Sequence, residues 1–107
     1  MASAQLAQQV ESVEQKFQRL AAGWRAETGH LSSITKMFNH PSYQEIIGLG
    51  AEVVPSLLRD LQKEPDHWFA ALRAITGAQP VAPEDRGQID KMADAWLRWA
   101  KDNGYRW

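Results

Sequence analysis

Apolar residues recur every three or four positions along much of the chain, which places them on one face of an α-helix. The clearest run lies near the N-terminus, at spacings of 4, 3, 4, 3 and 4, and comprises Leu6, Val10, Val13, Phe17, Leu20 and Trp24. With Ser3 as N-cap, it predicts one helix from Ser3 to Trp24, about 33 Å long at about 1.5 Å per residue. Such a helix either packs across the domain or overhangs it and pairs with another chain. We favour packing within the chain, because three heptads are short for a free coiled coil.

Two shorter helical segments are expected after a connector at residues 26–33, where Gly29 is predicted at the C′ position of the first helix. Residues 32–38 begin with two serines suited to capping and continue with enough apolar side chains for a short helical turn. Residues 39–50 place Asn39 or His40 at a cap and Pro41 at the first helical position, where its missing N–H costs nothing.

The second half of the chain predicts three further helices. Pro55 is tolerated only in a first turn, so the helix with Val54, Leu57, Leu58 and Leu61 starts near Val53. Asp66 is then expected as the N-cap of a helix that Gly77 ends, with an apolar stripe of Trp68, Ala71, Leu72 and Ile75. After a proline-containing loop, a last helix carries Ile89, Met92, Ala93, Trp96, Leu97 and Ala100. No stretch alternates as a strand does, so we predict an all-α fold, a compact bundle of about five helices.

Composition agrees with one folded domain covering residues 1–107. Of the 107 residues, 44% are hydrophobic and five are Trp, which is ample for a core. Twelve Lys and Arg against thirteen Asp and Glu leave a net charge of −1, without the basic excess that phosphate binding requires. The absence of cysteine excludes a disulfide framework, a thiolate zinc site and a cysteine nucleophile.

The N-terminal stretch MASAQLAQQVESVEQ has neither the basic region nor the apolar region of a secretory signal. The apolar runs are only a few residues long, whereas crossing a bilayer requires about 20. We therefore expect a soluble cytoplasmic protein that does not associate with membranes.

Residues 46–77, IIGLGAEVVPSLLRDLQKEPDHWFAALRAITG, resemble a HEAT-type repeat. The shared parts are a glycine corner, a proline early in the first helix, an LLRDLQ run and a second helix rich in Ala and Leu. The resemblance implies a HEAT-like helical hairpin on which the long N-terminal helix and the C-terminal helix pack, and whose exposed faces bind proteins. A solenoid needs about three units and one is present, so the flanking helices must cover the hairpin.

A wider pattern runs from HPSYQEIIGLG through PDHWFAALRAITG to MADAWLRWAKDNGY. It resembles a small bacterial family of unassigned function. This second resemblance implies a fold and a bacterial origin, and it implies no chemistry.

Asp66 and His67 are the pair of residues that most invites a catalytic or metal-binding interpretation. Neighbouring side chains on a helix point about 100° apart, so the two do not converge. His67 also lacks a His, Asp or Glu partner three, four or seven positions further on. We therefore expect Asp66 to cap and His67 to occupy the first helical turn. Serines at helix starts and the GLG sequence likewise fit capping and a tight corner, so we predict no enzyme, no catalytic residue, no metal site and no cofactor.

Four aromatic residues fall beside the predicted core stripes or after the last helix: Phe69, Trp99, Tyr105 and Trp107. One interpretation is that they make secondary core contacts. The other is that they form an exposed surface for a partner, since aromatic side chains give large contact area at low entropic cost. They are the candidate partner-binding residues of this sequence.

Two classes of function follow. The first is a small protein–protein interaction module, an adaptor, inhibitor or accessory subunit that binds a protein partner without catalysis. The alternative is a nucleic-acid-associated regulator with a helix-turn-helix-like element at residues 54–76. In that element Arg73 is the clear base-contacting donor of the second helix, which makes nucleic-acid binding the weaker hypothesis. Homodimerisation through the first helix is compatible with either function.

Overall fold

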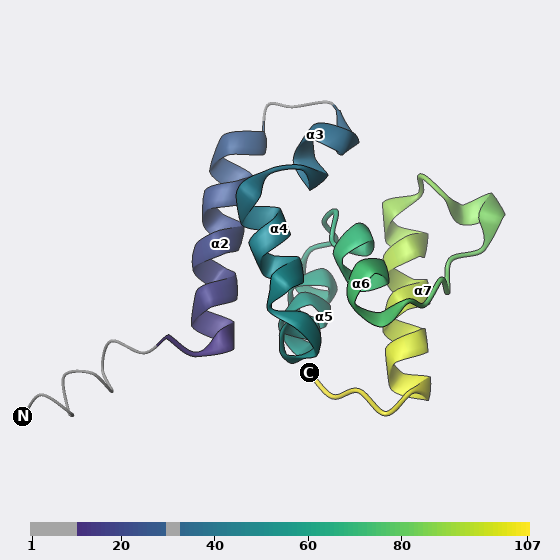
Figure 1. Ribbon diagram of the computed structural model, residues 1–107. Coiled ribbons are helices and arrows are strands. Elements are labelled where there is room, and N and C mark those ends of the chain that lie inside the picture. The colour runs from purple at the N-terminus through teal and green to yellow at the C-terminus, as the bar shows by residue number, and fades with distance from the viewer. Residues whose placement is uncertain (1–10, 30–32) are drawn as a thin grey trace, which may run out of the picture.

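The computed structural model describes residues 11–29 and 33–107, and within these residues it contains helices and no strands (Figure 1). The α-helices are α2 (Val13–Thr28), α3 (Ile34–Phe38), α4 (Pro41–Gly48), α5 (Val54–Lys63), α6 (Phe69–Thr76) and α7 (Ile89–Asp102). Two 3₁₀ turns complete them, η1 (Gly50–Val53) and η2 (Pro83–Asp85). Five of the α-helices have eight residues or more, and α3 is the short turn. The predicted all-α bundle is confirmed for the described residues.

The first described helix starts later than the apolar seam predicts. Ser12 has an extended backbone, with φ −69° and ψ 164°, and its side chain accepts a hydrogen bond from the backbone N–H of Gln15. The Gln15 side chain returns the bond to the Ser12 N–H, which completes a capping box. A single helix from Ser3 to Trp24 is therefore wrong at Ser12, because the extended cap interrupts it. Ser3, Leu6 and Val10 lie outside the described residues.

The far end of α2 also departs from the prediction. The helix continues to Thr28, four residues beyond Trp24, and the Thr28 hydroxyl donates to the Trp24 carbonyl at 2.6 Å. Gly29 is the C-cap, and its φ of −57° is right-handed. The prediction of a C′ glycine at this position is therefore wrong.

The starts of α4 and α5 follow the sequence signals. His40 caps α4, with its Nδ1 accepting from the Ser42 N–H at 3.1 Å, and Pro41 is the first helical residue. Pro55 lies in the first turn of α5, which begins at Val54 directly after η1. Gly50 adopts a left-handed φ of 73° between the two helices, a conformation that glycine reaches without a steric penalty.

The start of α6 corrects a prediction. Helix α6 begins at Phe69, and its N-cap residue is Trp68, whose side chain makes no capping hydrogen bond. Asp66 therefore does not cap α6, and His67 precedes the helix rather than occupying its first turn. Asp66 instead closes the local turn, since its side chain accepts from the His67 N–H and its carbonyl accepts from the Trp68 N–H. Gly77 ends α6 as predicted, with a left-handed φ of 74°.

Helices α2 and α7 lie on opposite sides of the molecule, with α4, α5 and α6 between them (Figure 1). Helix α2 packs on α4 and η1, α6 packs on α4 and α5, and α7 packs on α5. Trp68 is the aromatic centre, because its ring centroid lies 4.7 to 5.6 Å from those of Phe17, Trp24 and Tyr43. Trp68 and Trp96 are 0% and 2% exposed, so their predicted place in the core is confirmed.

Candidate interaction groove

The turn between α5 and α6 is tied to α2 by a polar network around Trp68. Arg25 of α2 donates from Nε to Asp66 at 2.9 Å and from Nη2 to Asp60. Asp60 also accepts from the Trp68 indole Nε1 at 2.7 Å, and the Arg25 guanidinium lies 5.6 Å from the centre of the Trp68 ring. Partial burial works to lower the pKa of Arg25, but its hydrogen bonds to the two carboxylates outweigh that effect and raise the pKa.

Tyr43 holds the same turn from the side of α4. Its hydroxyl donates to the His67 carbonyl at 2.8 Å and accepts from the Ala71 N–H at 3.0 Å. Burial raises the pKa of the Tyr43 phenol, because the ionised form would lose its hydration. The Asp66–His67 pair therefore has a structural role, with the carboxylate bound to Arg25 and the backbone carbonyl bound to Tyr43.

Beyond this turn, α6, the loop at residues 77–88 and α7 enclose a groove of about 740 Å³. This volume lies within the range of about 300 to 1,000 Å³ that ligand pockets usually have. The lining is mainly apolar and includes Phe38, Phe69, Ala70, Ala74, Ala78, Pro80, Val81, Ile89, Met92 and Trp96. Most of these side chains are half-buried, so the groove is an apolar surface open to solvent.

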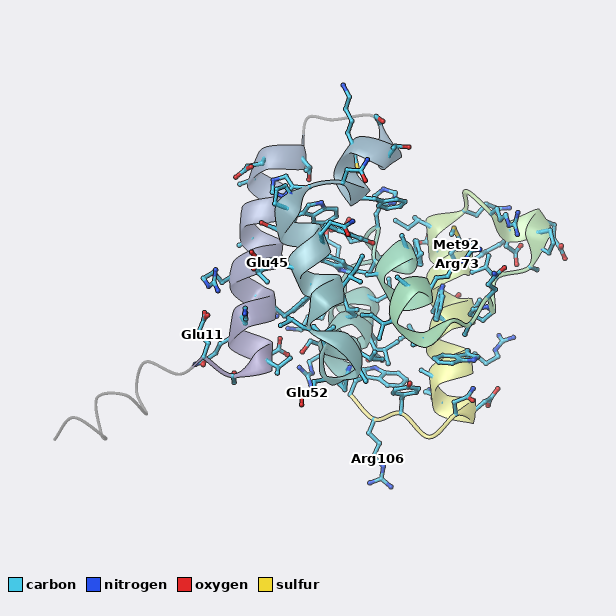
Figure 2. All side chains as sticks on the ribbon, in the orientation of Figure 1. Glu11, Glu45, Glu52, Arg73, Met92 and Arg106 are labelled. Atoms are coloured by element: carbon cyan, nitrogen blue, oxygen red, sulfur yellow. The ribbon has the colours of Figure 1, made fainter. Side chains whose placement is uncertain are left out.

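The polar residues of the groove are cationic or neutral. Arg73 of α6 lines the groove together with Met92 of α7 (Figure 2), and Arg86 lies in the loop before α7. His67 and Gln79 complete the polar lining, and no carboxylate lines the groove among the described residues. Arg73 and Arg86 are both exposed and have no ion pair within residues 11–29 and 33–107. In contrast, Arg19, Arg25 and Arg59 each pair with a carboxylate.

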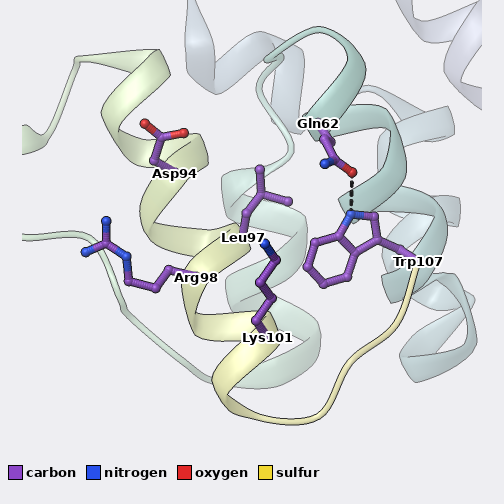
Figure 3. A pocket seen from close by; sticks show the side chains of 6 residues that line it. All are labelled: Gln62, Asp94, Leu97, Arg98, Lys101 and Trp107. Carbon is purple, nitrogen blue, oxygen red and sulfur yellow. Dashed lines mark hydrogen bonds between the residues drawn. The ribbon is translucent and has the colours of Figure 1, made fainter.

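A second, smaller pocket of about 290 Å³ lies between α5, α7 and the C-terminal segment (Figure 3). Trp107 folds back over it, and its indole Nε1 donates to the Gln62 side chain at 2.7 Å. Leu97 supplies the apolar wall, while Asp94, Arg98 and Lys101 make the rest of the lining charged. This pocket is therefore largely polar, and the C-terminal segment of the chain covers part of it.

The four aromatic candidates separate into two places. Phe69 lines the groove, whereas Trp99 and Tyr105 contact each other with ring centroids 5.4 Å apart. Trp99 also meets Trp96 edge-on at 5.5 Å, and Trp107 lies over the second pocket. All four are half-buried. Of this set, the structure brings Phe69 alone to the groove, and a partner-binding role for Trp99, Tyr105 and Trp107 remains a prediction.

The sequence does not predict that most of the residues lining the groove come together. Ala70 and Ala74 carry no chemical signal, and Val81 lies in a segment that reads as a loop. Arg73 stood out only as a donor for nucleic acid. The apolar character of the loop from Ala78 to Ala82, between two predicted helices, was the one available clue that this segment packs against a neighbour.

Within residues 11–29 and 33–107, no three His, Cys, Asp or Glu side chains are placed to hold a metal ion. The Nε2 of the half-buried His40 lies 2.7 Å from the carboxylate of the exposed Glu27, and His30 is outside the described residues. None of the helices in these residues combines the length and the apolar character that crossing a lipid bilayer requires.

The chain matches no family model, no characterised protein and no solved structure. The HEAT-type resemblance of residues 46–77 and the resemblance to a small bacterial family therefore stay predictions.

Proposed function

We propose that this chain is a small cytoplasmic protein–protein interaction module, an adaptor, inhibitor or accessory subunit, that binds a segment of a partner protein in the groove between α6, the loop at residues 77–88 and α7. The observation that carries the proposal is an open apolar groove of about 740 Å³. An apolar concave surface of this size gains free energy when a partner side chain displaces its water, by about 25 cal/mol per Å² of apolar area.

A role without catalysis is supported by what the candidate chemical groups do. Asp66 is bound to Arg25, and the Tyr43 hydroxyl is bound to two backbone groups. These groups are therefore used to hold the turn before α6. The groove presents mainly Ala, Phe, Ile and Met side chains, which give contact area, and no carboxylate among the described residues lines it beside His67.

A bulky substitution at Ala74 tests the proposal. Ala74 is exposed on α6 and lines the groove, so Ala74→Trp places a bulky ring in the groove while leaving the core packing intact. The tagged chain should be purified from the cells that produce it, and the retained proteins quantified by mass spectrometry. We expect one protein to be retained in stoichiometric amount by the wild type and lost from Ala74→Trp.

The matched control is Ala22→Trp, which adds the same side chain to an exposed position of α2, away from the groove. This variant should retain the partner as the wild type does. Loss of the partner from both variants, or its retention by both, would place the interface elsewhere. Retention of no protein by the wild type would contradict the proposal itself.

The nucleic-acid alternative rests on residues 54–76, which contain α5, the turn and α6. In its favour, Arg73 is exposed and without an ion pair in the described part of the chain. Against it, Ala71 and Leu72 are buried and Phe69 and Ala70 are half-buried, so α6 presents few base-contacting donors. Salt-dependent retention of the wild type on duplex DNA would favour this alternative.

A further inference from the structure

We propose that the partner segment is an acidic amphipathic helix, which lays apolar side chains along the groove and directs carboxylates to Arg73 and Arg86. This inference rests on the proposed function, because it names the partner class for the same groove. The inference is argued from three features of the groove, which are its apolar lining, the small residues on α6, and Arg73 and Arg86 at its rim.

The small residues of the groove favour a helix as the occupant. Ala70 and Ala74 are four residues apart and share one face of α6, so a second helix can approach its backbone closely. Ile89 and Met92 on α7 form the facing wall, and Trp96 lies deeper at 2% exposure. An eight-residue helix is about 12 Å long, so α6 offers two turns of contact to the i, i+3, i+4 and i+7 positions of a partner helix.

An extended segment fits this groove less well. Strand addition requires a strand edge with free backbone N–H and C=O groups. The α6 and α7 walls are helices whose backbone groups bond within the helix. The loop at residues 77–88 between them forms no strand and is interrupted by Pro80 and Pro83. The groove therefore recognises side chains rather than a backbone. An amphipathic helix is the segment that presents a continuous apolar face.

The two arginines of the groove favour a partner segment of negative charge. Arg73 and Arg86 line the groove, neither has an ion pair among the described residues, and no carboxylate in that part of the chain lines the groove beside them. A basic segment would bring like charges together, whereas an acidic one gains two charge-assisted hydrogen bonds. The chain as a whole is not basic, since its net charge is −1, so this preference is a property of the groove.

The test is a display selection of random 16-residue peptides on the wild-type chain, with enriched peptides then measured by fluorescence anisotropy. Peptides that Ala74→Trp no longer binds are those directed to the groove. We expect these peptides to carry a net negative charge and an apolar stripe at helical spacing. Their affinity should fall as the salt concentration rises.

Charge variants of the chain supply the decisive comparison. Arg73→Gln with Arg86→Gln should weaken binding of the acidic peptides about 3- to 10-fold and flatten the salt dependence. Arg98→Gln with Arg106→Gln removes the same charge from side chains that do not line the groove (Figures 2 and 3), and should change affinity less than about twofold. Ala74→Glu should weaken binding more than the neutral, equally sized Ala74→Gln.

The outcomes separate this inference from the proposed function. Groove-directed peptides that are neutral or basic would overturn the acidic partner and leave the interaction module standing. Acidic peptides weakened equally by both arginine pairs would overturn the role of the rim, because the effect would then be long-range charge. Duplex DNA binding that is lost with Arg73 and Arg86 would replace a protein partner by nucleic acid. An absence of groove-directed binders would contradict the proposed function as well.

Discussion

At the scale of single residues, Tyr43 joins α4 to the start of α6. Its ring stacks on Trp68 with an interplanar angle of 15°, and its hydroxyl bonds one carbonyl and one N–H of the segment that begins α6. The Ala71 N–H that it accepts from is buried. Removing the hydroxyl therefore leaves a buried donor without its partner, which costs more than the bond contributed.

Tyr43→Phe should lower the free energy of unfolding at pH 7 by about 1 to 3 kcal/mol, because the ring packing is retained and the two hydrogen bonds are lost. Urea denaturation followed by Trp fluorescence measures this change. The difference should also depend on pH, since burial raises the pKa of Tyr43 above that of an unfolded tyrosine.

The sign of that pH dependence follows from linkage. Below the unfolded pKa of about 10, Tyr43 is neutral in both states and its contribution is fully present. As the pH rises above about 10, Tyr43 ionises in the unfolded chain before it ionises in the folded one. The free energy of unfolding of the wild type therefore falls by up to about 1.4 kcal/mol per pH unit, and that of Tyr43→Phe does not fall for this reason. The difference in unfolding free energy between the two proteins should therefore become smaller from pH 9.5 to pH 11. A difference that stays constant would show that the Tyr43 hydroxyl is solvated in the folded protein.

At the scale of elements, the attachment of α2 to the turn before α6 depends on Arg25. Its guanidinium binds Asp60 and Asp66 and lies over Trp68. The Asp60 side chain is 13% exposed, so loss of its partner leaves a poorly hydrated carboxylate.

Arg25→Met should lower the free energy of unfolding by about 1 to 2 kcal/mol, a modest value because the Arg25 side chain is 40% exposed and the ion pair is screened. The control is Arg19→Met on the same helix. Arg19 pairs with Glu11 at the surface, where such pairs contribute little, so its loss should lower the free energy of unfolding much less than Arg25→Met does. Equal losses of unfolding free energy for the two variants, by thermal or urea unfolding, would argue against the Arg25 network as the attachment of α2 to the turn before α6.

The elements also show where sequence patterns succeed. Pro41 and Pro55 set the starts of α4 and α5 correctly, because a missing N–H restricts proline to a first turn. The apolar spacing near the N-terminus predicts a helix that continues through Ser12, whereas the Ser12–Gln15 capping box marks the start of α2 there. Asp66 is a good N-cap by composition, but Arg25, 41 residues earlier in the chain, binds its carboxylate. Contacts this distant are not encoded in a local pattern.

At the scale of the whole molecule, the groove is a product of tertiary packing. The sequence pointed to Phe69 through its place beside the core stripe. Three different elements supply Ala74, Arg86 and Met92. They come together because α7 packs on α5 and because the loop at residues 77–88 returns to α6. The apolar periodicity of the sequence therefore does not predict where the groove lies, although the sequence does show the aromatic and aliphatic residues that line it.

Amide hydrogen exchange on the wild-type chain, with and without the partner that it retains, tests the groove most directly. We expect binding to slow exchange at residues 69–81 and 86–96, which form α6, the loop and the first half of α7. Exchange at residues 13–28 of α2 should stay unchanged. Protection confined to α2, or to the segment around Trp107, would contradict the groove as the site of binding.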